Sequence, residues 1–104
     1  MALERLLRKT TKENLWLYVL SLLKEGPMYG YQLRTAIQHR FGFQVGEVTA
    51  YVVMYSLRKQ GLVRVLREER RRQGLARKYY SITPEGKALL SKGVSYLREL
   101  SERL

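Results

Sequence analysis

The fold is decided by residues 30–60, GYQLRTAIQHRFGFQVGEVTAYVVMYSLRKQ. The first half predicts a helix from near Gly30 to about Arg40, because its apolar side chains recur at helical spacing. These side chains are Leu33, Ala36, Ile37 and Phe41. Residues 41–43 predict a short turn, and a second helix follows from near Gly46 to Gln60. Two helices joined by a short turn form a helix-turn-helix pair.

The helix at residues 46–60 has two different faces. Apolar residues spaced i, i+3, i+4 and i+7 predict the face that packs into the core: Ala50, Val53, Met54 and Leu57. The outer face carries Val48, Thr49, Tyr51, Val52, Tyr55, Ser56 and Lys59. Such apolar and hydroxyl groups suit the major groove of DNA, where they meet thymine methyls and phosphates. The alternative for Tyr51 is that its ring packs against the neighbouring helix or a partner subunit.

An earlier helix is predicted from Thr10, because Thr10 followed by Glu13 is a capping-box pattern. It runs to about Glu25, where Gly26 and Pro27 stop it. Its middle, LWLYVLSLL at residues 15–23, is apolar on nearly every side, as in a helix that is buried centrally or clasped by a partner chain. Three further leucines either extend this helix or form a separate arm: Leu3, Leu6 and Leu7.

Downstream of the pair, residues 62–67 and 78–82 are rich in β-forming residues and are separated by a polar turn at 68–76, which predicts a hairpin. Thr83 then caps a last helix with Pro84 at its first position. The order helix, helix, helix, hairpin, helix predicts a mainly α fold with a small β-hairpin. This is a winged helix-turn-helix with an N-terminal helix and a C-terminal dimerisation helix.

The last helix carries an apolar stripe that is too wide for one subunit to cover. The candidate dimerisation residues are Leu90, Val94, Leu97, Leu100 and Leu104. A patch of this size, left exposed, exceeds what monomers usually show, so we expect a two-fold dimer.

Positive charge is concentrated in one part of the chain. The 104 residues carry 20 Lys and Arg against 9 Asp and Glu, a net charge of +11, which indicates a polyanionic partner and most simply nucleic acid. Residues 58–78 hold nine basic and two acidic side chains, and the run Arg70-Arg71-Arg72 falls on the predicted hairpin turn. An arginine-rich tip of this kind can reach a phosphate backbone or a narrow minor groove. The alternative is a solvated loop.

The residue inventory argues against enzymes and metal sites. The chain has no cysteine or aspartate and one histidine, His39, which we interpret as a surface or structural residue near a helix end. We therefore expect no catalytic residues, metal or cofactor. Trp16 is open to a ligand-binding interpretation, but a lone tryptophan on an apolar helix is more typical of a core or a dimer interface. The longest apolar run, residues 15–20, is too short to span a membrane, so we expect a cytoplasmic protein without membrane contact.

Three segments in this order resemble the PadR family of winged-helix transcriptional regulators. MYGYQL, residues 28–33, is similar to the family's Met-His-Gly-Tyr-x-Leu at the opening of the second helix. TAY, residues 49–51, is similar to Thr-Leu-Tyr in the recognition helix, and is followed by Leu57 and by GLV at 61–63. RKYYSITPEGKALL, residues 77–90, is close to the second wing strand and the following helix. The resemblance covers about residues 12–92.

The chain departs from the family pattern at three positions. Tyr29 replaces the usual histidine, Val48 a glycine, and Val52 a proline. Because Val48 and Val52 lie on the predicted groove face, the resemblance carries no operator preference to this chain.

The resemblance implies a homodimer built through the last and first helices, and a repressor that a small ligand such as a phenolic acid or drug relieves at the dimer interface. Residues 1–82 would form the DNA-binding domain and 83–104 the dimerisation helix. The expected contacts to double-stranded DNA are Thr49, Tyr51, Val52, Tyr55 and Ser56 in the major groove; Tyr29, Gly30, Tyr31 and Gln32 at a phosphate, where helix N-termini favour anions; and Arg70, Arg71, Arg72, Arg77 and Lys78 on the wing. A sequence-independent architectural nucleic-acid-binding protein and a winged-helix protein-interaction module are the alternatives.

Overall fold

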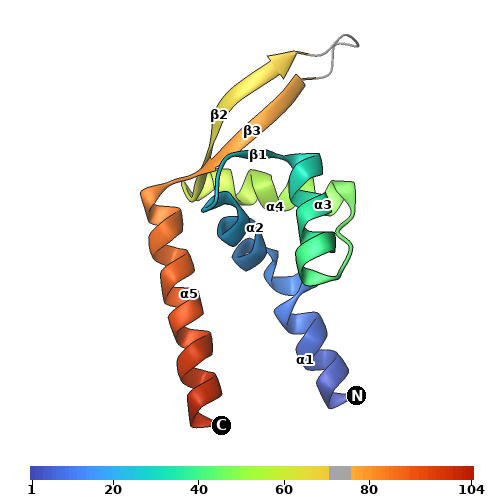
Figure 1. Ribbon diagram of the computed structural model, residues 1–104, viewed down its shortest axis with the longest axis vertical. Helices are drawn as coiled ribbons and strands as arrows, with labels where there is room; N and C mark the ends of the chain where they lie inside the picture. Colours follow the sequence, from blue (N-terminus) through green and yellow to red (C-terminus); the bar gives the residue numbers. More distant parts are fainter. Residues whose placement is uncertain (71–75) are drawn as a thin grey trace.

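The computed structural model describes residues 1–70 and 76–104 of the chain (Figure 1). Its helices are α1 (Ala2–Thr10), a short 3₁₀ helix η1 (Lys12–Asn14), α2 (Leu15–Leu23), α3 (Gly30–Phe41), α4 (Glu47–Lys59) and α5 (Pro84–Arg103). Its strands are β1 (Met28–Tyr29), β2 (Val63–Arg70) and β3 (Ala76–Ile82). The predicted fold class is confirmed: a mainly helical winged-helix structure with a small antiparallel sheet and a long C-terminal helix.

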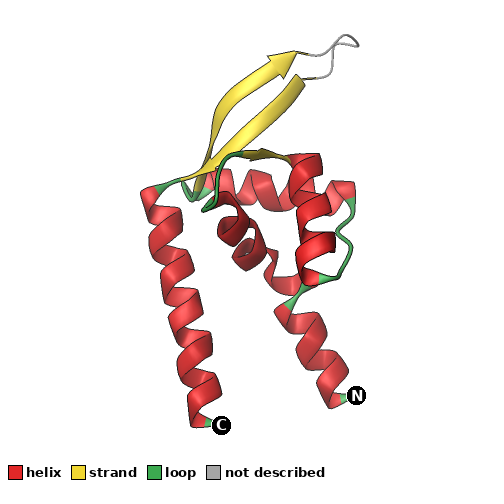
Figure 2. Cartoon of the chain, viewed as in Figure 1, coloured by secondary structure: helices red, strands yellow, loops and turns green. Residues whose placement is uncertain are grey.

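The chain is elongated because three of its parts project from the body. The β2–β3 hairpin, which we call the wing, extends from one end of the helical body, and α1 and α5 extend from the other, so that both termini lie far from the wing (Figures 1 and 2). The radius of gyration is 14.7 Å, whereas a compact domain of this length has about 13 Å. The projecting elements therefore expose long surfaces outside the core.

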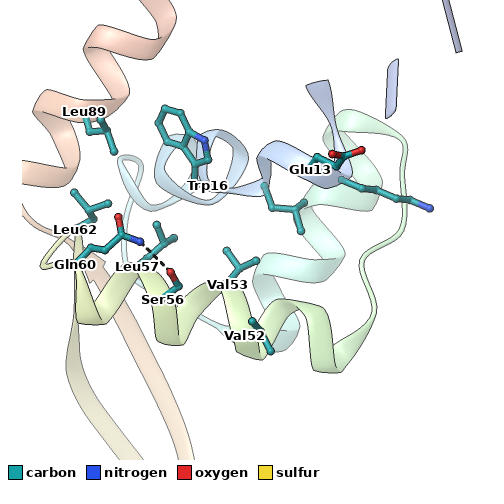
Figure 3. A pocket seen from close by; sticks show the side chains of 11 residues that line it. Glu13, Trp16, Val52, Val53, Ser56, Leu57, Gln60, Leu62 and Leu89 are labelled. Atoms are coloured by element: carbon teal, nitrogen blue, oxygen red, sulfur yellow. Dashed lines mark hydrogen bonds between the residues drawn. The ribbon is translucent and has the colours of Figure 1, made fainter. Parts of the chain in front are cut away.

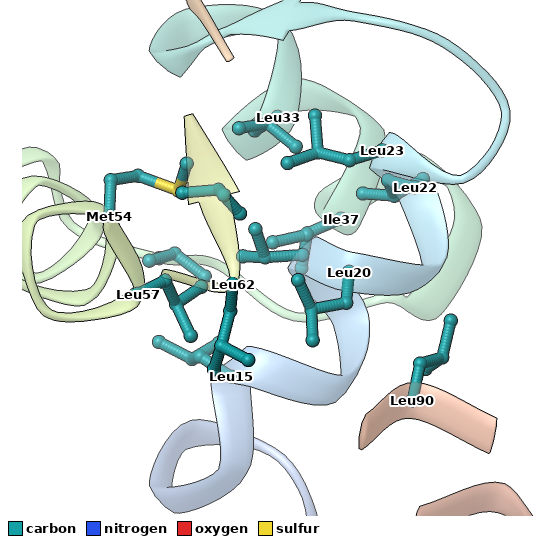
Figure 4. Close-up of a cluster of buried hydrophobic side chains, with 13 residues drawn as sticks. Leu15, Leu20, Leu22, Leu23, Leu33, Ile37, Met54, Leu57, Leu62 and Leu90 are labelled. Carbon is teal, nitrogen blue, oxygen red and sulfur yellow. The ribbon is translucent and has the colours of Figure 1, made fainter. Parts of the chain in front are cut away.

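The core is built around α2. Leu20 and Leu22 of α2 are fully enclosed, together with Val63 at the start of β2. Side chains of α3, α4 and α5 complete the cluster (Figure 4). This explains why α2 is apolar on nearly every side: α3, α4, β3 and α5 all contact it. The prediction of a centrally buried helix is confirmed.

The predicted capping box at Thr10 is wrong. Thr10 is the last residue of α1, and its hydroxyl donates to the carbonyl of Leu6 at 2.7 Å instead of capping a new helix. Glu13, the other half of the predicted box, accepts a hydrogen bond from Lys9 Nζ at 2.9 Å. The chain then turns through η1 before α2 begins at Leu15. The separate-arm alternative is therefore correct for the three leucines at positions 3, 6 and 7.

α3 and α4 are the predicted helix-turn-helix pair. α3 runs one residue beyond the predicted Arg40 and ends where Gly42 adopts a left-handed φ of 78°, which glycine tolerates without steric cost. In the following loop, Val45 is buried, and its carbonyl accepts a hydrogen bond from Arg34 Nε at 3.0 Å. α4 follows Gly46, and its predicted core face packs in or against the core: Ala50, Val53, Met54 and Leu57.

The wing is longer than the sequence predicts. The ladder of β2 and β3 continues to the pair Arg70↔Ala76, so that residues 68–70 and 76, which were predicted as turn, belong to strands. Opposite charges face each other in this extension, in the register pairs of Glu68 with Lys78 and Glu69 with Arg77. Cross-strand pairs of opposite charge favour strand pairing, which the β-propensity of single residues does not reveal.

A third strand was not predicted. β1 pairs antiparallel with β3 through Met28↔Tyr80 and Tyr29↔Tyr79, and the sheet order is β1-β3-β2. Two residues are too few to show a periodicity in the sequence. β1 places the start of α3 directly beside the wing.

α5 begins with the predicted cap. Thr83 Oγ1 accepts a hydrogen bond from the Gly86 amide at 3.1 Å and donates to the Gly61 carbonyl at 2.7 Å. Gly86 lies where the helix meets the end of α4: a Cβ at this position would lie 2.2 Å from the Leu62 carbonyl oxygen. The direction in which α5 leaves the sheet therefore depends on the absence of a side chain at this residue.

We expect Gly86→Ala to destabilise the fold by about 1–3 kcal/mol, the range typical of overpacking, because the backbone oxygen it meets cannot swing away. Gly30→Ala is the matched control, because no atom lies within 4 Å of the added Cβ. Urea unfolding monitored by circular dichroism gives the midpoint of each variant. An unchanged m-value confirms that a shifted midpoint reports a change in stability. Equal midpoints for Gly86→Ala and Gly30→Ala would contradict the close contact.

Candidate nucleic-acid interface

The outer face of α4 is exposed, as the sequence predicts. Tyr51 is 66% exposed, and Val52 and Tyr55 are also more than half exposed. Thr49 lies on the same face and is exposed as well. The alternative that the Tyr51 ring packs within its own chain is therefore wrong. A helix face with apolar groups and phenols in solvent offers both methyl contacts and hydroxyl donors to a groove of DNA.

Ser56, the last of the predicted α4 contacts, is engaged within the helix. Its Oγ accepts a hydrogen bond from Gln60 Nε2 at 2.9 Å (Figure 3). The hydroxyl keeps its own proton for a further acceptor.

The N-terminus of α3 lies next to this face. The Tyr29 amide donates to Gln32 Oε1 at 3.2 Å, so the Gln32 side chain caps the helix. Tyr31 is exposed, and the first amides of α3 have no acceptor within the helix. This end of α3 therefore directs N–H groups and a positive dipole outward, which favours an anion.

A groove connects α3, α4 and the wing. It has a volume of about 940 Å³ and is lined by tyrosines and by charged side chains. The tyrosines in its lining are Tyr29, Tyr31, Tyr51 and Tyr80, and its charged residues are Arg34, Glu47, Arg77 and Lys78. Six of the predicted site residues line this groove: Tyr29, Gly30, Tyr31, Tyr51, Arg77 and Lys78. The groove thus joins members of all three predicted groups, but of the α4 contacts only Tyr51 lines it, whereas Val52 and Ser56 line a second groove beside Trp16.

Arg34 and Tyr80 are among the lining residues of this groove that sequence reasoning missed. Arg34 is half-buried on α3, where its Nε is held by the Val45 carbonyl. Tyr80 is half-buried on β3, and burial raises the pKa of its phenol above the usual value. The sequence did contain a signal for Tyr80. Tyr79 and Tyr80 are adjacent on a predicted strand, and neighbouring residues of a strand face opposite sides of the sheet.

The wing carries the remaining predicted contacts. Arg70 is exposed, but it lies at the end of β2 and not in the predicted turn. Arg71 and Arg72 lie outside the described residues. Lys78 lies 3.9 Å from Glu68, an exposed pair that contributes little to stability and that a phosphate can replace.

The predicted dimerisation stripe divides into two parts. Leu90 is only 6% exposed and belongs to the core of its own chain, so it is not free for a partner. Beyond it the helix leaves the body, and Leu97 is 42% exposed. The exposed part of the stripe consists of Val94, Leu97, Leu100 and Leu104. α1 extends from the same end of the body, and its leucines are also exposed: Leu3, Leu6 and Leu7.

Trp16 packs between α2 and α5. It is half-buried against the core cluster, and a Cβ on Gly93 of α5 would lie 2.8 Å from its ring. The ring also lines a second groove, of about 370 Å³, with Leu57, Leu62 and Leu89 (Figure 3). The wall of this groove includes side chains of α4, so Trp16 connects α5 to the helix whose outer face is exposed. Trp16 therefore packs beside the enclosed core without belonging to it, and part of its ring stays accessible in the groove. His39 is exposed on α3.

Within residues 1–70 and 76–104, every helix is too short or too polar to cross a lipid bilayer.

A family model matches residues 19–92, which include the helix-turn-helix and the wing; its description is the transcriptional regulator PadR-like family. A curated relative from Lysinibacillus sphaericus, protein X, is 36% identical over 86 residues, and the match covers 81% of this chain and 78% of the relative. A 37.1 kDa protein of a Streptomyces fradiae transposon is 31% identical over 86 residues; this match covers 83% of the chain but only 24% of that protein.

Solved structures share the fold. A PadR family transcriptional regulator from Eggerthella lenta superposes with a TM-score of 0.81 at 28% identity, covering 97% of this chain and 87% of that one. The Bacillus subtilis PadR protein, solved in complex with operator DNA, superposes with a TM-score of 0.69 at 23% identity, covering 77% of this chain and 47% of that one. The chain thus spans about half the length of the Bacillus protein.

We expect Tyr51→Phe to weaken binding of a specific duplex by about 0.5–1.5 kcal/mol per subunit, roughly 2- to 12-fold, since it removes one hydroxyl from an exposed ring. The unfolding midpoint stays unchanged because the ring is not part of the core. Tyr96→Phe on α5 is the control, since Tyr96 is similarly exposed but lies on α5. Fluorescence anisotropy with a labelled duplex is the measurement. Equal affinities of Tyr51→Phe and wild type would exclude a contact by this hydroxyl.

Proposed function

The chain belongs to the transcriptional regulator PadR-like family, and we propose that it acts as a homodimeric repressor that binds one operator sequence in double-stranded DNA. Membership in this family makes it a transcriptional regulator and not an enzyme. The observation that carries the proposal is the exposed outer face of α4, which borders a groove shared with the start of α3 and with the wing.

In this proposal α4 enters the major groove. Its contacts to base edges and phosphates come from Thr49, Tyr51, Val52, Tyr55 and Ser56. The first turn of α3 binds a backbone phosphate through residues 29–32, because helix N-termini favour anions. The wing lies along the neighbouring DNA backbone or in the minor groove. Its basic side chains there are Arg70, Arg71, Arg72, Arg77 and Lys78. The Bacillus subtilis PadR protein, which shares this fold, was solved in complex with operator DNA, and this supports DNA binding by the fold.

The homodimer forms through α5 and α1. Support comes from the apolar side chains that α5 exposes beyond Leu90 and from the exposed leucines of α1, which extends from the same end of the body. In this assembly the DNA contacts come from the domain of residues 1–82, and residues 83–104 form the dimerisation helix, to which α1 adds apolar surface. Burying like surface against like surface produces a two-fold axis. Two α4 helices related by this axis require a palindromic site, with half-sites about 34–36 Å apart.

A small apolar molecule at the dimer interface completes the proposal. The groove beside Trp16 supports it, because its lining joins α2 and α4 and includes Leu89 of α5. A ligand that stacks on Trp16 would contact Val53 on the side wall of α4 and would thereby influence how the two α4 helices are held. The protein would act in the cytoplasm, together with the DNA that it binds.

The architectural alternative rests on charge alone. A protein that binds any duplex equally needs phosphate contacts but no exposed apolar groups toward base edges. Val52 and the rings of Tyr51 and Tyr55 favour the reading of base edges. A protein-interaction module, the third possibility, would bind DNA without salt dependence or not at all.

Binding should depend steeply on salt. If a dimer neutralises about six to ten phosphates, affinity falls by about 10³–10⁵ between 50 and 200 mM salt. Replacing Arg70, Arg71 and Arg72 with alanine should flatten the logarithmic slope, because fewer counterions are released. The control removes the same charge from α5, at Lys87, Lys92 and Arg98, and should leave the slope unchanged. Identical slopes for both triple variants would mean that the tip of the wing does not contact DNA.

Leu97→Glu should dissociate the dimer, because it places an unpaired charge in an apolar interface. Ser95→Glu adds the same charge on the opposite side of α5 and should leave the dimer intact. Sedimentation velocity at micromolar concentration distinguishes the dimer from the 12.3 kDa monomer. A monomeric wild-type protein would contradict the dimer and the palindromic site together.

A further inference from the structure

Four side chains form a continuous stack on one face of the sheet. The Arg67 guanidinium carbon lies 4.0 Å from the centroid of the Tyr79 ring. The Tyr79 ring meets the Tyr29 ring edge to face, with centroids 5.3 Å apart and an interplanar angle of 71°. The Arg77 guanidinium carbon lies 4.0 Å from the centroid of the Tyr29 ring. We call this set, Arg67, Tyr79, Tyr29 and Arg77, the wing stack.

The register of the sheet brings the wing stack together. Tyr79 of β3 is paired with Arg67 on one side and with Tyr29 on the other, so the three side chains point to the same face. Arg77 precedes Tyr79 by two residues on β3 and therefore shares that face. The stack crosses all three strands, and Tyr29 is the residue immediately before α3. It thereby connects the wing to the start of the helix-turn-helix.

The two arginines of the wing stack are not equivalent. Arg67 is neutralised from its own strand, because its Nε lies 3.6 Å from Glu69 Oε1. The same carboxylate accepts a hydrogen bond from the Tyr79 hydroxyl at 3.5 Å. Arg77, in contrast, makes no ion pair or side-chain hydrogen bond with any residue that the structure describes. The ring of Tyr29 holds the Arg77 guanidinium in position, and Arg77 lines the groove next to α4.

We propose that Tyr29 is a positioning residue for DNA binding: its ring holds the Arg77 guanidinium flat, so that the N–H edge meets a phosphate of the bound duplex. Arg67 and Tyr79 brace the Tyr29 ring from the wing side. This inference rests on the proposed function. A guanidinium stacked on an aromatic ring keeps its N–H groups directed outward in its own plane, and it loses less conformational freedom when a phosphate binds than an unrestrained side chain does. Tyr29 thus contributes to affinity through Arg77, and Arg77 contacts the DNA.

A double-mutant cycle tests this dependence. Cation–π contacts of exposed side chains correspond to about 2- to 5-fold in affinity per subunit, so Tyr29→Leu should weaken operator binding by about 5- to 30-fold for a dimer. Tyr29→Phe keeps the ring and should bind within about twofold of wild type. In the Arg77→Ala background, Tyr29→Leu should cost less than twofold, because no guanidinium remains to be held. A full additional loss in that background would overturn the proposal.

A second measurement reads the wing stack without DNA. The side-chain protons of Arg77 should show upfield ring-current shifts in the NMR spectrum of the free protein. These shifts should persist in Tyr29→Phe and disappear in Tyr29→Leu. Unshifted Arg77 protons in the wild-type protein would show that the stack does not form, and would overturn the proposal even if a variant failed to fold.

The two readouts separate this inference from the function on which it rests. If the wild-type protein binds its duplex but the effects of Tyr29→Leu and Arg77→Ala simply multiply, only the role of Tyr29 is overturned. A wild-type protein that binds no duplex overturns the proposed function and this role with it.

Discussion

The architecture depends on the burial of α2. This helix has no polar face to present to solvent, and Leu20 and Leu22 are fully enclosed only because the other elements pack around them. α3 and α4 pack against it and against each other, which fixes the angle of the helix-turn-helix. Since the core face of α4 is committed to this cluster, its opposite face must point to solvent. The rings of Tyr51 and Tyr55 are thus exposed because the opposite face of α4 packs into the core.

The same constraint explains the two ends of the molecule. The core uses α5 only as far as Leu90, and the remainder of that helix continues into solvent with its apolar side chains uncovered. At the other end, β1 pairs with β3 directly before α3 starts, so the wing cannot be displaced without disturbing the N-terminus of α3. One buried helix therefore orients the candidate DNA interface on one side of the body, while the proposed dimer surface lies on the other.

Much of the fold could be predicted because the decisive patterns are local. The 3.6-residue periodicity of residues 30–60 defined both faces of α4, and Thr83 with Pro84 marked the start of α5. The failures occurred where the deciding contact is distant in sequence or competes locally. Thr10 matches a capping box, yet its hydroxyl bonds back to Leu6 and ends the preceding helix. The length of the wing depends on cross-strand pairs such as Glu68↔Lys78, which only the register reveals. For the same reason the sequence did not indicate that Arg67 and Tyr79 stack beside Arg77, although Arg77 itself was predicted as a DNA contact. Leu90 was predicted to contact a partner subunit, but its own chain already buries it.

The central claim is that two α4 helices, related by a two-fold axis, read one DNA sequence. Selection of bound duplexes from a random pool at about 150 mM salt tests it most directly, because competition among sequences removes the contribution that all phosphates make equally. The account predicts enrichment of a single inverted repeat whose half-site centres are about one helical turn, 10 to 10.5 base pairs, apart. A pool that is bound but shows no enriched sequence, or an enriched site without two-fold symmetry, would contradict it.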